Sequence, residues 1–176
     1  MRVVLLLRGV NVGGVTVRSA DLRSVLADAG LDDVLTVLAS GNAVVTASSA
    51  SAAARTAEAA LEARYGRRIR VLGIGVDALA AVVGAYPHGE DDEHTPYVVF
   101  ELQPGVVAPL IDVETSAGEE TALGDGVLYW SNPKGSTLTS AFAKAAERIA
   151  RSAKGDARDA TTTRNLRTLR KVLAAA

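Results

Sequence analysis

The stretch VVLLLRGVNVGG, residues 3–14, carries the clearest structural signal in the chain. Its five consecutive apolar residues, Val3–Leu7, predict a strand that is buried on both faces. Arg8 ends the apolar run, and Asn11 and the pair Gly13-Gly14 follow where the chain must turn. The pattern is typical of a strand-to-helix turn that needs left-handed backbone. It equally suits an anion site, in which glycine amides and the Arg8 guanidinium converge on one ligand.

The residues that follow predict the order βαββαβ. Ser19 is a suitable N-cap for a helix that ends at Gly30, and Gly66 is a suitable end for a second, alanine-rich helix. The predicted elements are a strand at Val3–Leu7, a helix from Ser19, strands at Val34–Ala39 and Ala43–Ala47, a helix from Ser51, and a strand at Arg68–Ile74. This order is typical of the ferredoxin-like unit, in which two helices cover one face of an antiparallel sheet.

The second half of the chain predicts a degenerate version of the same unit. A short helix capped by Asp77 and ended by Pro87 leads into the acidic stretch 88–95, which is too polar to pack and predicts a linker. The remaining predictions are strands at Tyr97–Leu102, Glu120–Leu123 and Val127–Ser131, a helix at Val106–Val113, and two closing helices that carry Leu138, Phe142, Ala145 and Ile149, then Leu166, Leu169 and Leu173. We therefore expect an α+β protein with a ferredoxin-like βαββαβ half at 1–87, a linker at 88–95, and a βαββαα half at 96–176.

Composition excludes several classes of protein. Of the 176 residues, 48% are hydrophobic and 22% are charged, a balance that indicates a globular domain rather than a disordered chain. The absence of cysteine excludes disulfides and thiolate metal sites. No apolar run approaches the ~20 residues that a membrane span needs, and the first run is too short for a signal peptide. These features, with the excess of arginine over lysine, predict a cytoplasmic bacterial protein.

Two turns carry further candidate ligand-binding residues. Ser40-Gly41-Asn42 lies between two predicted strands, where a plain hairpin turn is favoured over a ligand role for Ser40 and Asn42. Asn132-Pro133-Lys134-Gly135 predicts a type I turn that delivers Ser136 or Thr137 as a helix cap. Lys134 would then lie beside a helix N-terminus, where phosphate binds readily. Trp130 either offers a stacking face there or fills the core, and both readings stay open.

The basic C-terminal region and the two histidines complete the candidates. Thr161–Asn165 is expected to open the last helix, with Arg164, Arg167 and Lys171 on one face and Asn165 nearby. Such a stripe can hold phosphates, but a solvated helix face has the same pattern. Stacking aromatic residues are missing from this region, which disfavours nucleic acid. His88 and His94 flank the acidic stretch without the spacing of a metal site, so neither a metal nor a Ser-His-Asp triad is expected.

Four motifs together resemble a known family. Residues 8–14 read RGVNVGG where the family typically has RGINVGG, and residues 39–45 read ASGNAVV beside QSGNVVF. Tyr129-Trp130 and Ser136-Thr137-Leu138 are similar to its tryptophan-containing turn, and residues 162–168 read TTRNLRT beside TTRNWNT. The sequence resembles the uncharacterised bacterial family 1697 among the domains of unknown function. The resemblance implies ferredoxin-like α+β halves and no agreed activity.

The resemblance suggests that the distinctive polar residues face one cleft between the two halves. The leading hypothesis is a protein without a cofactor that binds a small anionic or phosphorylated ligand there. One alternative is a hydrolase or transferase that acts on a phosphate or acyl ester through Ser40, Ser131 or Ser136, and the other is nucleic-acid binding through the basic C-terminal helix. The predicted ligand-binding residues are Arg8, Asn11, Gly13, Gly14, Ser40, Asn42, Trp130, Lys134, Ser136, Arg164 and Asn165.

Overall fold

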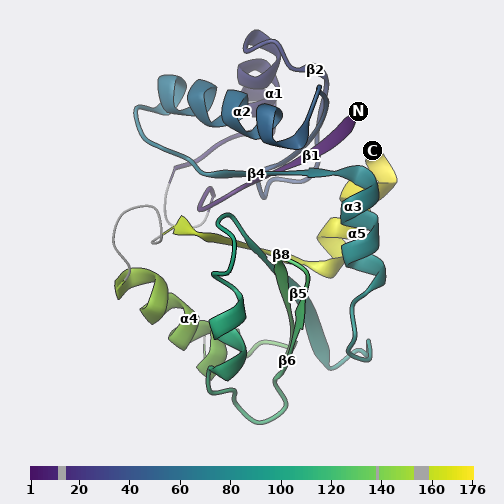
Figure 1. The fold of residues 1–176 in the computed structure, drawn as a ribbon, viewed down its shortest axis with the longest axis vertical. Helices are drawn as coiled ribbons and strands as arrows, with labels where there is room; N and C mark the ends of the chain where they lie inside the picture. The colour runs from purple at the N-terminus through teal and green to yellow at the C-terminus, as the bar shows by residue number, and fades with distance from the viewer. Residues whose placement is uncertain (12–14, 138, 153–158) are drawn as a thin grey trace. The chain divides into compact units, whose positions relative to one another are not determined.

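Two four-stranded antiparallel sheets form the framework of the chain (Figure 1). The computed structural model describes residues 1–11, 15–137, 139–152 and 159–176, so Gly13, Gly14 and Leu138 lie outside the described residues. The chain divides into two compact units, one formed by Met1–Ala81 with Thr168–Ala176 and the other by Val82–Arg167. We call them unit 1 and unit 2. The α+β class predicted from the sequence is confirmed.

Unit 1 has the predicted ferredoxin-like order. Its elements are β1 (Arg2–Leu7), α1 (Ser19–Asp28), β2 (Asp32–Thr36), β3 (Asn42–Thr46), α2 (Ala50–Tyr65) and β4 (Val71–Gly75), followed by the start of α3 (Val76–Gly84) and, from the end of the chain, most of α5 (Leu166–Ala175). The sheet order is β2-β3-β1-β4, and every neighbouring pair is antiparallel. The βαββαβ prediction is therefore confirmed.

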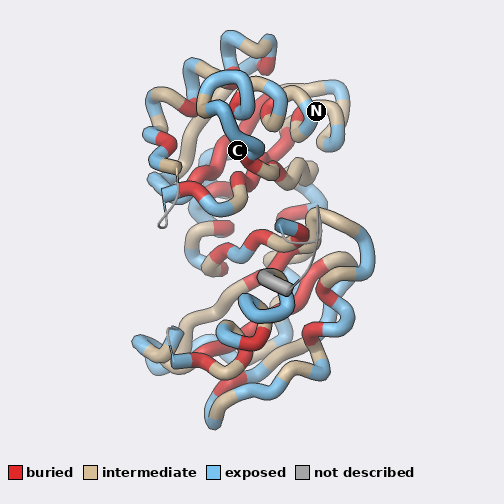
Figure 2. Tube along the Cα trace, turned by 90° about the vertical axis from the view of Figure 1, so that its left-hand side faces the viewer, coloured by how far each residue is buried: buried red, intermediate tan, exposed pale blue. Residues whose placement is uncertain are grey.

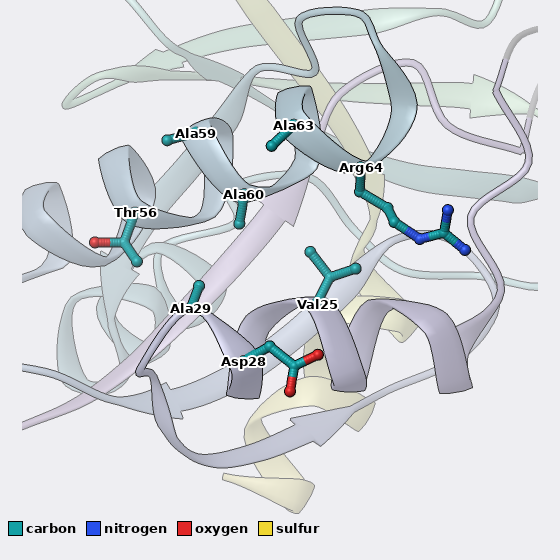
Figure 3. A pocket seen from close by; sticks show the side chains of 8 residues that line it. All are labelled: Val25, Asp28, Ala29, Thr56, Ala59, Ala60, Ala63 and Arg64. Atoms are coloured by element: carbon teal, nitrogen blue, oxygen red, sulfur yellow. The ribbon is translucent and has the colours of Figure 1, made fainter.

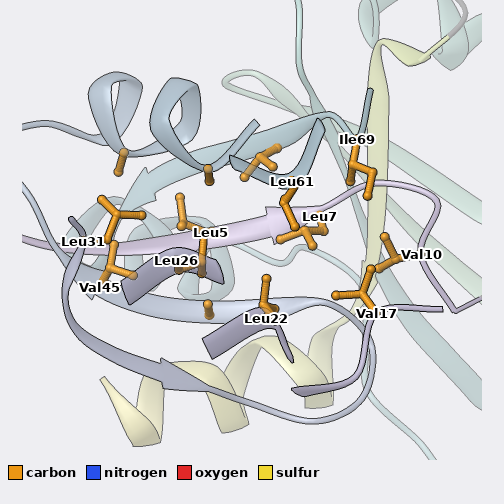
Figure 4. Close-up of a cluster of buried hydrophobic side chains, with 14 of the residues drawn as sticks. Leu5, Leu7, Val10, Val17, Leu22, Leu26, Leu31, Val45, Leu61 and Ile69 are labelled. Atoms are coloured by element: carbon orange, nitrogen blue, oxygen red, sulfur yellow. The ribbon is translucent and has the colours of Figure 1, made fainter. Parts of the chain in front are cut away.

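Strand β1 is central to unit 1 because it is buried on both of its faces. Val3, Leu5 and Leu7 join the core that both helices cover, where they meet side chains of α1 and α2 such as Leu22 and Leu61 (Figure 4). The alternate residues Val4 and Leu6 are also fully buried, and Figure 2 shows buried residues along this strand. A strand that is covered on both faces has a continuous run of apolar residues, and the run Val3–Leu7 predicted such a strand here.

The ends of the helices agree with the sequence in part. Helix α2 begins at Ala50, one residue before the predicted Ser51, and Ser49 caps it, since its hydroxyl oxygen accepts a hydrogen bond from the amide of Ala52 at 3.2 Å. Gly66 ends the helix as predicted, in left-handed backbone with φ of 67°. The predicted cap at Ser19 is wrong. Arg18 occupies the N-cap position of α1, and the Ser19 hydroxyl instead donates to the carbonyl of Leu38 at 3.4 Å.

Unit 2 repeats the strand order of unit 1. Its elements are the end of α3, β5 (His94–Glu101), the 3-10 helix η1 (Ala108–Asp112), β6 (Glu120–Gly124), β7 (Val127–Pro133), α4 (Ala141–Ser152), β8 (Thr161–Asn165) and the start of α5. The sheet order β6-β7-β5-β8 corresponds, strand for strand, to β2-β3-β1-β4. None of the described helices has both the length and the apolar composition that a bilayer span requires.

Three boundary predictions in unit 2 are wrong. Thr161–Asn165 forms strand β8 and pairs with β5 from Glu101 to Tyr97, so a strand separates the two closing helices instead of the predicted αα ending. Three consecutive threonines favour this strand because β-branched side chains suit a pleated surface. Helix α4 begins at Ala141 rather than at Ser136 or Thr137, and the last two residues of the predicted linker 88–95 belong to β5.

Gly73 in β4 lies so close to helix α2 that a larger residue should destabilise unit 1. A Cβ atom at Gly73 would overlap the backbone carbonyl of Ala50, the first residue of α2, which cannot move without shifting the helix. We expect Gly73→Ala to lower the free energy of unfolding by about 2 kcal/mol or more, as overpacking does. Gly75→Ala is the matched control in the same strand, since its Cβ would meet only the flexible methyl end of Met1 at 3.1 Å. Urea denaturation of both variants checks this, and equal stabilities would contradict it.

Candidate functional site

Asn11 organises the loop after β1. Its backbone is left-handed, with φ of 61°, a conformation that asparagine tolerates better than most residues. The side-chain Nδ2 donates to the carbonyls of Val17, at 3.0 Å, and Ala39, while Oδ1 accepts from the amide of Val17 at 2.8 Å. Donor and acceptor groups of the Asn11 amide are thus engaged in holding the loop, which supports the turn reading of this residue.

The hairpin at Ser40-Gly41-Asn42 lies against the same loop. Gly41 has φ of 72°, and a Cβ atom there would lie 2.5 Å from a methyl of Val10, so both backbone and space require glycine. The Leu7 amide donates to the Gly41 carbonyl at 2.9 Å. Asn42 is fully buried and donates to the Val37 carbonyl at 3.0 Å and to Ser40 Oγ at 2.8 Å. The structure therefore brings two predicted motifs together at one end of the unit 1 sheet.

Arg8 directly follows β1, at the same end of the unit 1 sheet as the Asn11 loop and the hairpin at Ser40-Gly41-Asn42. Its amide donates to the carbonyl of Arg70 at 2.8 Å, which extends the pairing of β1 with the chain before β4, and its side chain is half-buried.

Trp130 belongs to the core of unit 2. Only 4% of its surface is exposed, and its ring stacks on Tyr97 with 4.8 Å between centroids and packs against Phe142 at 5.1 Å. Its indole nitrogen donates to Glu119 at 3.2 Å. Its burial and these two ring contacts support the core reading rather than a ligand-stacking role.

The turn after β7 is held by a buried asparagine. Asn132 is fully buried, its Nδ2 donates to Thr137 Oγ1 at 3.3 Å, and its Oδ1 accepts from the Ser136 hydroxyl at 3.1 Å. Lys134 is exposed at the tip of the turn, and its amide donates to the Glu93 carbonyl at 2.8 Å. The polar groups of this turn maintain its shape, and Ser136 does not cap a helix.

Helix α4 instead begins at a buried carboxylate that the sequence analysis missed. Glu119 is 8% exposed; its Oε1 accepts from Trp130 and from the Ser140 hydroxyl, and its Oε2 accepts from the amides of Ser116 at 2.6 Å and Phe142 at 3.4 Å. Burial raises the pKa of Glu119, but the four hydrogen bonds outweigh burial and lower the pKa overall. A carboxylate at a helix N-terminus is further favoured by the helix dipole.

Arg164 lies in β8 rather than on a helix face. It is 9% exposed, and its Nη1 donates to Thr162 Oγ1 and to the Thr163 carbonyl, each at 2.9 Å. Burial lowers its pKa to about 10, so the guanidinium keeps its charge at neutral pH. The neighbouring Asn165 accepts a hydrogen bond from the Arg167 amide at 2.8 Å and thereby caps α5.

Lys134 and Arg164 lie far apart in unit 2. Arg164 is paired with Val98 of β5, whereas the Lys134 amide bonds to Glu93, five residues earlier along the chain. At a rise of about 3.4 Å per residue, this places them roughly 17 Å apart along the strand direction.

The two histidines each pair with one carboxylate. Nδ1 of His88 is 3.2 Å from Glu120, and its ring packs edge-on against Tyr86, so His88 is not the solvated linker residue that was predicted. Nδ1 of His94 is 3.0 Å from Asp91, whose pKa is lowered by this hydrogen bond. Among the described residues, no group of three or more histidine and carboxylate side chains is placed to hold a metal ion.

A hollow of about 670 Å³ lies between α1 and α2 on the outside of unit 1 (Figure 3). Half of its lining residues are alanines, three from α2 and Ala29 from the C-cap of α1, and Asp28 of α1 and Arg64 of α2 also line it. None of the predicted ligand-binding residues lines it.

Comparison with known proteins gives a family and a fold. A sequence model of the family described as "Protein of unknown function (DUF1697)" matches residues 1–129. The solved structure of the conserved bacterial protein SP0830 from Streptococcus pneumoniae superposes with a TM-score of 0.73 at 22% sequence identity, covering 99% of this chain and 97% of that one. At this identity the likeness shows the fold alone. No curated protein matches the sequence.

The Glu119 network predicts a pH-dependent loss of stability. All four partners of Glu119 donate hydrogen bonds, so in the Glu119→Gln variant the new amide nitrogen would face donors and could not accept from them. We expect this variant to lower the free energy of unfolding by about 1–3 kcal/mol at pH 7. Because the folded-state pKa is lowered, the stabilisation is complete above the ordinary pKa of about 4.3 and disappears as pH falls through the folded value.

The difference between parent and variant should therefore shrink below about pH 4. Guanidinium denaturation of both proteins at several pH values from about 3 to 7, a range that spans the ordinary carboxyl pKa, measures this difference. Glu114→Gln, at an exposed position in the same loop, is the control and should be neutral. A difference that stays constant with pH would contradict an ionised Glu119.

Proposed function

The chain belongs to the DUF1697 family, whose members are proteins of unknown function, and we propose that it binds a small anionic ligand with Arg164 as the principal charged contact. Arg164 lies in the TTRN motif, one of the four through which the sequence resembles the family. The single observation that carries the proposal is a guanidinium that is charged yet nine-tenths buried.

Burial of this cation supports an anionic partner. Removing a charge from water is costly, and the lowered pKa of Arg164 is a direct consequence of that cost. A phosphate or carboxylate bound to the guanidinium would add charge-assisted hydrogen bonds to those that Arg164 makes within the protein, and such bonds are about twice as strong as neutral ones. The planar guanidinium also matches the geometry of both anions in a bidentate contact.

Orientation of the side chain supports the same proposal. Thr162 and Thr163 hold Nη1 through two hydrogen bonds of equal length, which fixes the plane of the guanidinium before a ligand arrives. Such preorganisation increases affinity because less side-chain freedom is lost on binding. The ligand class that fits is a small phosphate ester or carboxylate.

The other predicted cations have a weaker case. The backbone of Lys134 lies roughly 17 Å from that of Arg164 along the strand direction, so the two residues are not neighbours in the sheet. Arg8 belongs to unit 1, and its participation in a cleft shared with Arg164 stays a prediction. The Arg8→Ala variant tests it, since a shared ligand loses affinity when either arginine is removed.

The two alternative functions receive less support. Among the described residues, the hydrogen bonds of Ser40 and Ser136 go to asparagines and backbone rather than to a histidine, as an activated serine would require. Arg167 and Lys171 remain exposed on α5, but Arg164 does not share their helix, so the predicted phosphate-binding stripe is shorter.

Binding of phosphate compounds by Arg164 variants tests the proposal. We expect inorganic phosphate, a sugar phosphate or a nucleoside monophosphate to raise the melting temperature of the parent protein. Arg164→Gln should lower the affinity for whichever compound binds the parent by about 10- to 100-fold, as loss of a charged hydrogen-bonding partner does. Arg164→Lys keeps the positive charge but lacks the paired N–H donors of the guanidinium, so it should lose less affinity. Isothermal titration calorimetry measures the affinities.

Arg167→Gln is the matched control, because Arg167 is exposed three residues further along the chain. It should bind as the parent does. Far-UV circular dichroism verifies that each variant is folded. Equal affinity of the parent and both Arg164 variants, or no response of the parent to any of the three anions, would overturn the proposal.

A further inference from the structure

A second hollow, of about 410 Å³, lies between η1 and α4 in unit 2. One wall comes from the end of η1 and the residues after it, Asp112, Val113 and Glu114. The other wall comes from the first two turns of α4 and carries Lys144 and Arg148 over two alanines, Ala141 and Ala145. None of the residues that the sequence analysis singled out as ligand-binding lines it.

The two walls carry opposite charges. Lys144 and Arg148 are four residues apart in α4 and therefore project from the same side of the helix. Asp112 and Glu114 face them from the η1 side, and all four residues are exposed. Within the described parts of the chain, no ion pair closer than 4 Å joins these two walls. The hollow thus separates two cations from two carboxylates.

The floor between these charges is apolar, and both walls are anchored. Val113, Ala141 and Ala145 line the hollow between the charged groups. The Ala141 amide donates to Ser116 Oγ at 3.0 Å, and Glu119 holds both Ser116 and Phe142, so the segment after η1 is fastened to the first turn of α4. Leu110 of η1 and Phe142 of α4 share one hydrophobic core. The spacing of the walls is consequently fixed by buried contacts.

We propose that this hollow binds a free α-amino acid with an aliphatic side chain. The carboxylate of the zwitterion lies toward Lys144 and Arg148, the ammonium group toward Asp112 and Glu114, and the side chain over Val113, Ala141 and Ala145. A zwitterion satisfies both charged walls at once, which neither a simple anion nor a simple cation does. This site is separate from Arg164, so it stands or falls independently of the anion proposed above.

Three related probes separate the contributions of the two charges. L-Leucine carries both charges, L-leucinamide lacks the carboxylate, and 4-methylpentanoate lacks the ammonium group. We expect saturable binding of leucine to the full chain, observed by ligand-detected NMR, and at least about tenfold weaker binding of each analogue. Equal binding of leucine and either analogue, or no saturable binding of leucine, would overturn the proposal.

Variants of the charged walls identify the location. Arg148→Gln should lower the affinity for leucine about tenfold and leave the already weak binding of leucinamide unchanged. Asp112→Asn should lower the affinity for leucine and leave the binding of 4-methylpentanoate unchanged. All of these positions are exposed, so the variants should fold, which circular dichroism verifies. Lys171→Gln, an exposed lysine of α5, is the control and should bind leucine as the parent does. Leucine binding that is insensitive to both wall variants would place the site elsewhere and refute the assignment.

Discussion

The buried carboxylate of Glu119 is the interaction on which the arrangement of unit 2 depends. It receives hydrogen bonds from the segment before β6, from Trp130 of β7 and from the start of α4, so one side chain joins three parts of the chain that are distant in sequence. An ionised group survives in this position because four donors surround it, which also lowers its pKa. The same carboxylate ties the segment after η1 to the start of α4, next to the hollow that we propose as an amino-acid site.

The two units show how one strand order serves different local purposes. Both sheets place their first strand between the third and fourth, which buries β1 and β5 at the centre of each sheet. Unit 1 covers its sheet with two full α-helices, whereas unit 2 replaces the first of these with the short 3-10 helix η1. The shorter cover leaves room beside α4, and the charged hollow lies there.

Most of the distinctive polar residues proved to have structural tasks. Asn11, Asn42 and Asn132 each use the side-chain amide to satisfy backbone or hydroxyl groups in a tight turn, and Asn165 caps a helix. Asparagine suits these positions because its short side chain carries both a donor and an acceptor. Arg164 also makes hydrogen bonds within its own motif, but it carries a charge, which is why we propose it as a contact for an anion.

The sequence by itself determined the α+β class, the order of unit 1 and its buried central strand, because hydrophobic periodicity and glycine positions are local signals. It indicated both readings of Trp130, and only packing against Tyr97 and Phe142 favoured the core. Strand β8 was missed, although three threonines signalled it, because a leucine repeat in the residues that follow suggested a longer helix. Glu119 and the charged hollow beside α4 carried no sequence signal. Glu119 lies 23 residues before its partner Phe142, and only the pairing of β6 with β7 and the docking of α4 bring these parts of the chain together.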